Sequence, residues 1–178
     1  NVYDDLTLRN GTVTIGDEAT NTCVIWMLQE GKLKVEDDVI VTSPDGNWCI
    51  GLWSDCTESE VTVEGSLIGS HGLTVNGNST SENNKVVIAD GANIDVDGLA
   101  LYLAGVATTE INNATVKGGI TGVEIRAGSL TVNEGAQIAG GMGVPSASPN
   151  AGGTTSENIG IAIIQHTTKK PIDVQING

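Results

Sequence analysis

The segment EGAQIAGG at 134–141 repeats a phrase that recurs along the chain. Each copy has an acidic residue or Asn, then small residues that usually include Gly, and soon afterwards a branched apolar residue. The clearest copies begin at Asn10, Glu64, Asp90, Asn113 and Glu134. From Glu64 onward, successive copies are separated by 26, 23 and 21 residues. This loose period indicates a repeat architecture.

Two further phrases repeat in phase with the first. One is an alternating apolar segment near residues 23, 49, 72, 98, 122 and 160, and the other is a second alternating segment near residues 32, 60, 85, 109, 129 and 171. Alternation between Gly, Asn and Asp turns predicts short strands, three in each unit. Because one unit cannot bury its apolar face alone, the units are expected to stack as a solenoid.

We therefore predict an all-β chain that forms one domain over 1–178. Its architecture is a parallel β-helix of about six to seven coils with three short strands per coil. Coils stacked ~4.8 Å apart would form a rod roughly 30 Å long. The repeat pattern resembles that of the right-handed parallel β-helices of the pectin-lyase-like superfamily over essentially the whole chain, which implies the same handedness. A β-sandwich or a jelly roll is the alternative.

The recurring phrase has a physical explanation at the corner of a coil. Gly relaxes the bend, the small residue fits the crowded corner, and the branched residue enters the core. The leading polar residue is a turn former. Stacked in successive coils, the leading residues would form a column that could attract Ca²⁺: Glu64, Asp90, Asn113 and Glu134. Since Ca²⁺ needs roughly six to eight convergent oxygens, we favour the turn role and expect no cofactor.

The composition argues against two classes of partner. The 178 residues include 22 acidic and 8 basic ones, and the net charge of −14 disfavours nucleic acid and anionic membranes. No apolar run approaches the ~20 residues that span a bilayer, so we expect no membrane insertion. The sequence starts at Asn1 with no recognisable signal peptide, and we expect a processed product or a piece of a longer repetitive protein.

The three cysteines fit no zinc-ligand spacing. Cys23 and Cys49 precede the first strands of adjacent coils, and one strand spacing is compatible with either a disulfide or a stacked pair of buried thiols. We favour thiols, and we expect Cys56 to be unpaired.

Catalytic motifs of the resembled superfamily are not matched. His71 in SHG and the pair Asp37–Asp38 look like polygalacturonase phrases, but they fall on different parts of their coils. No pair of carboxylates flanks a common position, as glycoside hydrolysis requires. A lyase would need clustered Asp and a basic residue; Glu124 and Arg126 share a strand, but only 8 basic residues exist. We assign His71 to a coil corner and favour a non-enzymatic protein.

Exposed aromatic residues suggest a ligand site. The first strands align with their inward residues at Val24, Ile50, Leu73, Leu99, Val123 and Ile161, which predicts that Trp26 points inward and Met27 outward. Aromatic rings stack on the apolar faces of sugars, so the outward face predicts a glycan-binding strip formed by Trp53, Asn76, Tyr102, Glu124 and Arg126. Two alternatives remain open: a loop covers this face, or a one-residue register error turns the aromatic side chains inward.

A Pro-, Gly- and Ser-rich stretch at 141–158 is predicted to be an irregular inserted loop beside the strip. We expect an extracellular or cell-surface domain, a stalk or adhesin that binds a polysaccharide, a host or cell-surface glycan, or a protein partner. The composition looks like that of bacterial β-solenoids, and the localisation rests on this resemblance. Two alternatives are a carbohydrate-active β-helix enzyme (a lyase or hydrolase with an unrecognised or degenerate site) and a purely structural segment.

Overall fold

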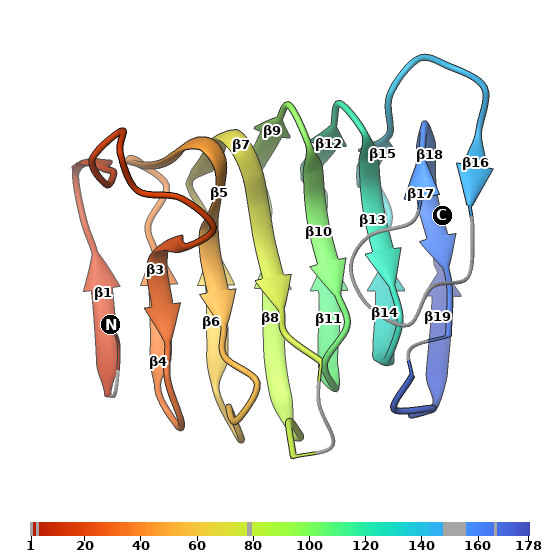
Figure 1. Cartoon of the computed structure of the whole chain (residues 1–178), viewed down its shortest axis with the longest axis horizontal. Helices are drawn as coiled ribbons and strands as arrows, with labels where there is room; N and C mark the ends of the chain where they lie inside the picture. The colour runs from red at the N-terminus through yellow and green to blue at the C-terminus, as the bar shows by residue number, and fades with distance from the viewer. Residues whose placement is uncertain (1, 3, 78–79, 148–155, 166) are drawn as a thin grey trace.

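Strands stack in parallel along the chain, from β1 at the N-terminal end to β18 and β19 at the C-terminal end (Figure 1). The computed structural model describes residues 2, 4–77, 80–147, 156–165 and 167–178. Every regular element in these segments is a strand. The described part of the chain contains no helix that is long and apolar enough to cross a membrane.

The middle strands of successive coils form a 7-stranded parallel sheet. In spatial order its members are β1 (Asp5–Leu8), β4 (Lys32–Val35), β6 (Glu60–Val63), β8 (Asn84–Ile88), β11 (Ala107–Ile111), β14 (Gly128–Val132) and β19 (Ile172–Ile176). Along each strand the residues alternate between the core and solvent, so Leu33, Val61 and Val86 form one buried column.

The other two strands of each coil belong to a 10-stranded sheet. The sheet joins both sides of the coil because β5 (Val39–Leu52) and β7 (Ser66–Val75) continue through the corner between them. Its remaining members are β2 (Gly11–Val13), β3 (Cys23–Met27), β9 (Asn93–Val96), β10 (Leu99–Leu103), β12 (Thr115–Gly118), β13 (Thr121–Ile125), β15 (Gln137–Ala139) and β18 (Ile159–Ile163). The predicted all-β solenoid with three strands per coil is confirmed, and seven stacked middle strands agree with the predicted number of coils.

The inserted loop predicted at 141–158 carries two short strands. β16 (Ser146–Ala147) and β17 (Ser156–Glu157) pair with each other in antiparallel fashion. Residues 148–155 of this loop lie outside the described residues.

The corner phrase has the structural role expected of it. Gly91 and Gly135 adopt φ values of 79° and 83°, a left-handed conformation that glycine adopts without steric cost. The branched residue of the phrase then points into the core: Leu67, Ile94 and Val116 are fully buried and stack on one another in consecutive coils. The phrase recurs because it fills the same layer of the core in successive coils, and the copies at Asp90 and Glu134 share the left-handed glycine.

The alignment predicted for the first strands is wrong in two coils. Ile25, not Val24, pairs with Ile50, and Leu101, not Leu99, pairs with Leu73. Side chains alternate along a strand, so the one-residue shift in β3 turns Met27 into the core, where it is fully buried.

The same shift turns Trp26 outward, next to Gly51. The two-residue shift in β10 leaves its inward and outward faces unchanged but moves Tyr102 level with Thr74 and Glu124. The chain period is too loose for phrase matching to fix these offsets.

The one-residue shift in β3 also changes which residue lies beside Cys23 on the neighbouring coil. Cys23 pairs with Trp48 and not with Cys49, and all three cysteines are free and buried. Burial raises the pKa of Cys23 to about 12 and the pKa of Cys49 to about 11. Both are therefore protonated thiols at neutral pH.

Thr109 is a polar residue in an aliphatic column of the core. It lies between Val86 and Leu130 on the neighbouring coils, and its hydroxyl is buried with no hydrogen-bond partner among the described residues. A buried hydroxyl without a partner costs free energy. Thr109→Val should therefore raise the free energy of unfolding by about 1 kcal/mol.

Urea unfolding followed by circular dichroism measures this change, and Thr108→Val is the matched control. Thr108 is exposed on the same strand, so its replacement should have little effect. A Thr109→Val protein less stable than the wild type would show that the hydroxyl is satisfied in the folded state.

Candidate functional site

The three tryptophans of the chain line one shallow groove on the outer face of the 10-stranded sheet. The groove has a volume of about 470 Å³, and we call it the aromatic groove. Its other lining residues include His71, Thr74, Asn76 and Tyr102. These residues come from four successive coils, through β3, β5, β7 and β10.

One wall of the groove is a pair of tryptophans. The rings of Trp26 and Trp53 meet edge to face, with centroids 5.0 Å apart and an interplanar angle of 81°. The indole nitrogen of Trp26 donates to the Thr22 hydroxyl at 3.1 Å. Gly51 makes room for this arrangement, because a Cβ there would lie 2.7 Å from the Trp26 ring. Trp53 remains 43% exposed.

A second group of rings is centred on Trp48. The Trp48 indole stacks on the imidazole of His71, with centroids 4.7 Å apart and planes inclined by 23°. Tyr102 also lines the groove, and its ring centroid lies 6.2 Å from that of Trp48. Burial raises the pKa of Tyr102 and lowers the pKa of His71, so both side chains favour their neutral forms.

The structure divides the predicted strip into an exposed part and a buried part. Trp53, Asn76 and Tyr102 line the aromatic groove. Glu124 and Arg126 are both fully buried, with 3.8 Å between Glu124 Oε1 and Arg126 Nη1. These two residues are therefore not accessible to a glycan in this structure.

A covering segment accounts for this burial. Ser156 donates from its backbone nitrogen at 3.2 Å and from its hydroxyl at 2.5 Å to Glu124 Oε2. Arg126 donates to the Gln165 carbonyl at 3.4 Å and to the Tyr102 hydroxyl at 3.5 Å. The alternative of a covering segment thus holds for the C-terminal end of the strip, and the groove ends at Tyr102.

Sequence reasoning missed three members of the groove. The sequence alignment places Trp26 in the core and His71 at a coil corner, and the predicted strip does not include Trp48. Backbone pairing puts Trp48 and His71 in one row across adjacent coils, and it puts Trp26 in another row with Gly51 and Thr74. Three tryptophans within two consecutive repeats, in a chain with 3% aromatic residues, were the available signal.

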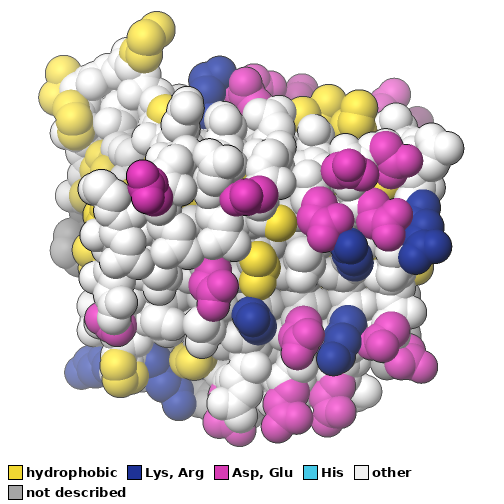
Figure 2. Space-filling model, turned by 180° about the vertical axis from the view of Figure 1, so that it is seen from behind, with side chains coloured by type: hydrophobic (Ala, Val, Ile, Leu, Met, Phe, Trp, Pro, Cys, Tyr) yellow, Lys and Arg dark blue, Asp and Glu magenta, His cyan; other side chains and the backbone are white. Residues whose placement is uncertain are grey.

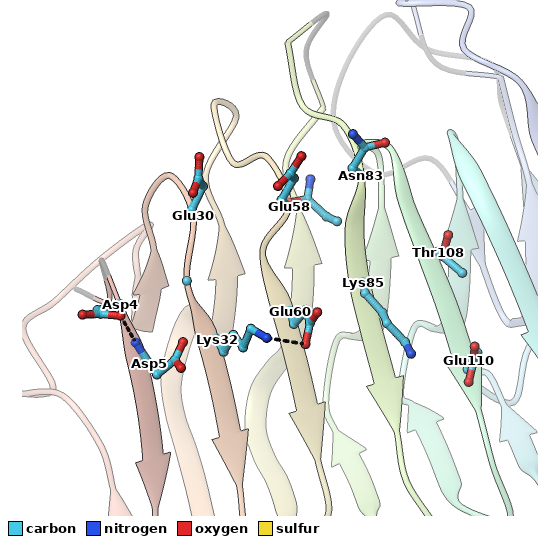
Figure 3. A pocket seen from close by; sticks show the side chains of 12 residues that line it. Asp4, Asp5, Glu30, Lys32, Glu58, Glu60, Asn83, Lys85, Thr108 and Glu110 are labelled. Atoms are coloured by element: carbon cyan, nitrogen blue, oxygen red, sulfur yellow. Dashed lines mark hydrogen bonds and ion pairs between the residues drawn. The ribbon is translucent and has the colours of Figure 1, made fainter.

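A larger hollow of about 780 Å³ lies over the 7-stranded sheet, and its lining is charged (Figure 3). Six carboxylates line it together with Lys32 and Lys85. Backbone pairing stacks Asp5, Lys32, Glu60 and Lys85 in that order, and Lys32 lies 3.6 Å from Glu60. Opposite charges on adjacent strands stabilise a sheet, so we interpret this hollow as a structural charge ladder.

Acidic and basic side chains are also interspersed on the face shown in Figure 2, where acidic ones predominate. Within the described residues, no group of three or more His, Cys, Asp or Glu side chains could hold a metal ion. Glu64, from the column considered for Ca²⁺, forms an ion pair with Lys34 at 3.0 Å.

The Trp26–Trp53 wall depends on the absence of a side chain at residue 51. In Gly51→Ala the new methyl group would overlap the Trp26 ring and Cys23 Sγ. We expect the free energy of unfolding to fall by about 1–3 kcal/mol. The tryptophan emission spectrum should also change, because Trp26 must move.

Chemical unfolding and emission spectra test this, with Gly160→Ala as the matched control. Gly160 lies on β18 of the same sheet, where a Cβ would meet only the Ile138 carbonyl oxygen, at 3.6 Å, among the described residues. An unfolding midpoint and an emission spectrum that Gly51→Ala leaves unchanged would contradict the packing described for Trp26.

No protein-family model, curated protein or solved structure matches this chain. The geometry and chemistry of the aromatic groove are therefore the basis for inferring a function.

Proposed function

We propose that this protein is a non-enzymatic surface domain that binds a neutral glycan in the aromatic groove. The observation that supports this is the gathering of all three tryptophans with Tyr102 around one open groove. Tryptophan in a core serves packing, but Trp53 is 43% exposed on the outside of the solenoid. Its exposure favours recognition over a role in stability.

The chemistry of the groove suits a carbohydrate. Aromatic rings present flat apolar faces to the C–H groups of a sugar ring, and tryptophan and tyrosine add a polar group at the edge. Asn76, Thr74 and Asn21 lie among the rings and can exchange hydrogen bonds with sugar hydroxyls. A mostly apolar site with a few placed polar groups is the usual design of a small-ligand site.

Charge favours a neutral glycan over an acidic one. The chain has a net charge of −14, and no lysine or arginine is among the described residues that line the groove. An acidic polysaccharide would be repelled by the protein as a whole, without a cation in the groove to offset this repulsion.

Binding without cleavage is favoured by the lining of the groove. Glycoside hydrolysis generally uses two carboxyl groups that flank the scissile bond. The described residues that line the aromatic groove include no Asp or Glu, and Glu124 is buried beneath Ser156. The alternative of a carbohydrate-active enzyme of the pectin-lyase-like superfamily has no comparable support. An extracellular stalk or adhesin remains the setting that we propose for this domain.

Fluorescence titration with neutral and acidic oligosaccharides tests the proposal. We expect tryptophan emission to change saturably with at least one of cellohexaose, xylohexaose and mannohexaose, and not with hexagalacturonate. Trp53→Ala should weaken the binding about tenfold, because loss of one stacking ring costs on the order of 1.4 kcal/mol.

Ile40→Ala is the control, since Ile40 is similarly exposed, at 38%, but does not line the groove. Release of reducing sugar is followed in parallel. Tryptophan emission that does not change with any of the three neutral hexaoses would refute glycan binding as proposed. Catalytic release of sugar would refute the non-enzymatic assignment.

A further inference from the structure

His71 is held in a fixed orientation beside the groove. The backbone nitrogen of Leu99 donates to His71 Nδ1 at 3.0 Å, and Trp48 stacks on the imidazole face. Gly98 provides the space, because a Cβ at that position would overlap the imidazole ring. The backbone of His71 is also anchored, since its nitrogen donates to the Ser43 hydroxyl at 3.2 Å and that hydroxyl donates to the His71 carbonyl oxygen at 3.1 Å.

This orientation determines which ring nitrogen carries the proton. Nδ1 accepts a hydrogen bond from Leu99 and so has no proton of its own. Burial lowers the pKa of His71 below its ordinary value of 6.5, so the ring is neutral at pH 7. A neutral imidazole that carries no proton on Nδ1 bears its hydrogen on Nε2. The ring therefore offers one donor, Nε2–H, from the wall of the groove.

We infer that His71 is the polar anchor of the aromatic groove: its Nε2–H donates to a glycan oxygen while Trp48 and Tyr102 contact the sugar face. This inference rests on the proposed function. Rings alone bind many sugars, whereas a donor of fixed position selects those with an acceptor at the matching place. His71 would thus contribute to specificity as well as to affinity.

Glycan binding through His71 should depend on pH, and the titratable groups near His71 determine how. The elements around His71 carry these titratable groups: Asp45 and Cys49 on β5, Asp95 on β9, Asp97 at the following corner, Tyr102 on β10 and Cys23 on β3. The three carboxylates are exposed, whereas burial raises the pKa values of both thiols and of the phenol.

A protonated Nδ1 could no longer accept the hydrogen bond from the Leu99 backbone nitrogen, so the imidazole ring would move from the position described above. The neutral form is the one that the fold favours. Binding should therefore be constant above pH 7 and weaken as the pH falls below 6.5 through the lowered pKa.

The variant His71→Asn distinguishes the proposed role of His71 in glycan binding from its role in the fold. Its amide oxygen can still accept from Leu99, but it has no donor at the position of Nε2. We expect this variant to bind the tightest of the three neutral hexaoses about tenfold more weakly at pH 7.5, with no further loss at pH 5.5. The wild type should lose affinity over the same pH range, and unfolding curves without sugar report the stability of both proteins.

Nitrogen-15 NMR of the wild type gives a second readout that needs no variant. Hexaose binding should shift the Nε2 resonance of His71 more than its Nδ1 resonance. A hexaose that binds both proteins equally, with an unchanged Nε2 resonance and no pH dependence, would overturn the role of His71 and leave the proposed function intact. Absence of binding by every neutral hexaose would overturn both.

Discussion

In-register parallel pairing between coils is the constraint on which the rest of the structure depends. It places the same position of each coil directly above the last, so inward positions form aliphatic columns such as Leu67, Ile94 and Val116. Outward positions are stacked by the same rule. The outer surface is therefore a set of columns as ordered as the core, and a slip of one residue would exchange the two.

The aromatic groove exists because two coils break the uniformity of these columns. Gly51 follows Trp26 in one outward column and allows the indole to lie over it. Gly98 does the same for the imidazole of His71. At the C-terminal end, Ser156 covers Glu124 and closes the groove. Small residues open the site, and a segment from outside the regular coils limits its length.

The sequence was sufficient to predict the solenoid, its three strands per coil and most of the core, because these depend on periodicity. The groove depends on register, which a period varying from 21 to 26 residues leaves uncertain by one or two residues. Because of that uncertainty, the predicted inward and outward directions of Trp26 and Met27 are exchanged relative to the structure. The burial of Glu124 and Arg126 was not predictable, since it depends on how a long loop returns to the coils. In the sequence, His71 stands out only as part of a phrase that resembles a catalytic motif, whereas its stacking on Trp48 depends on the register.

Fluorine-19 NMR of protein labelled with 5-fluorotryptophan tests the central claim most directly. Trp26, Trp48 and Trp53 should give three resonances, each assigned by a single Trp→Phe substitution. Because the three rings line one groove, titration with the neutral hexaose that binds should move all three resonances with a single common Kd. Resonances that stay fixed, or that respond with separate affinities, would contradict a single glycan site in the aromatic groove.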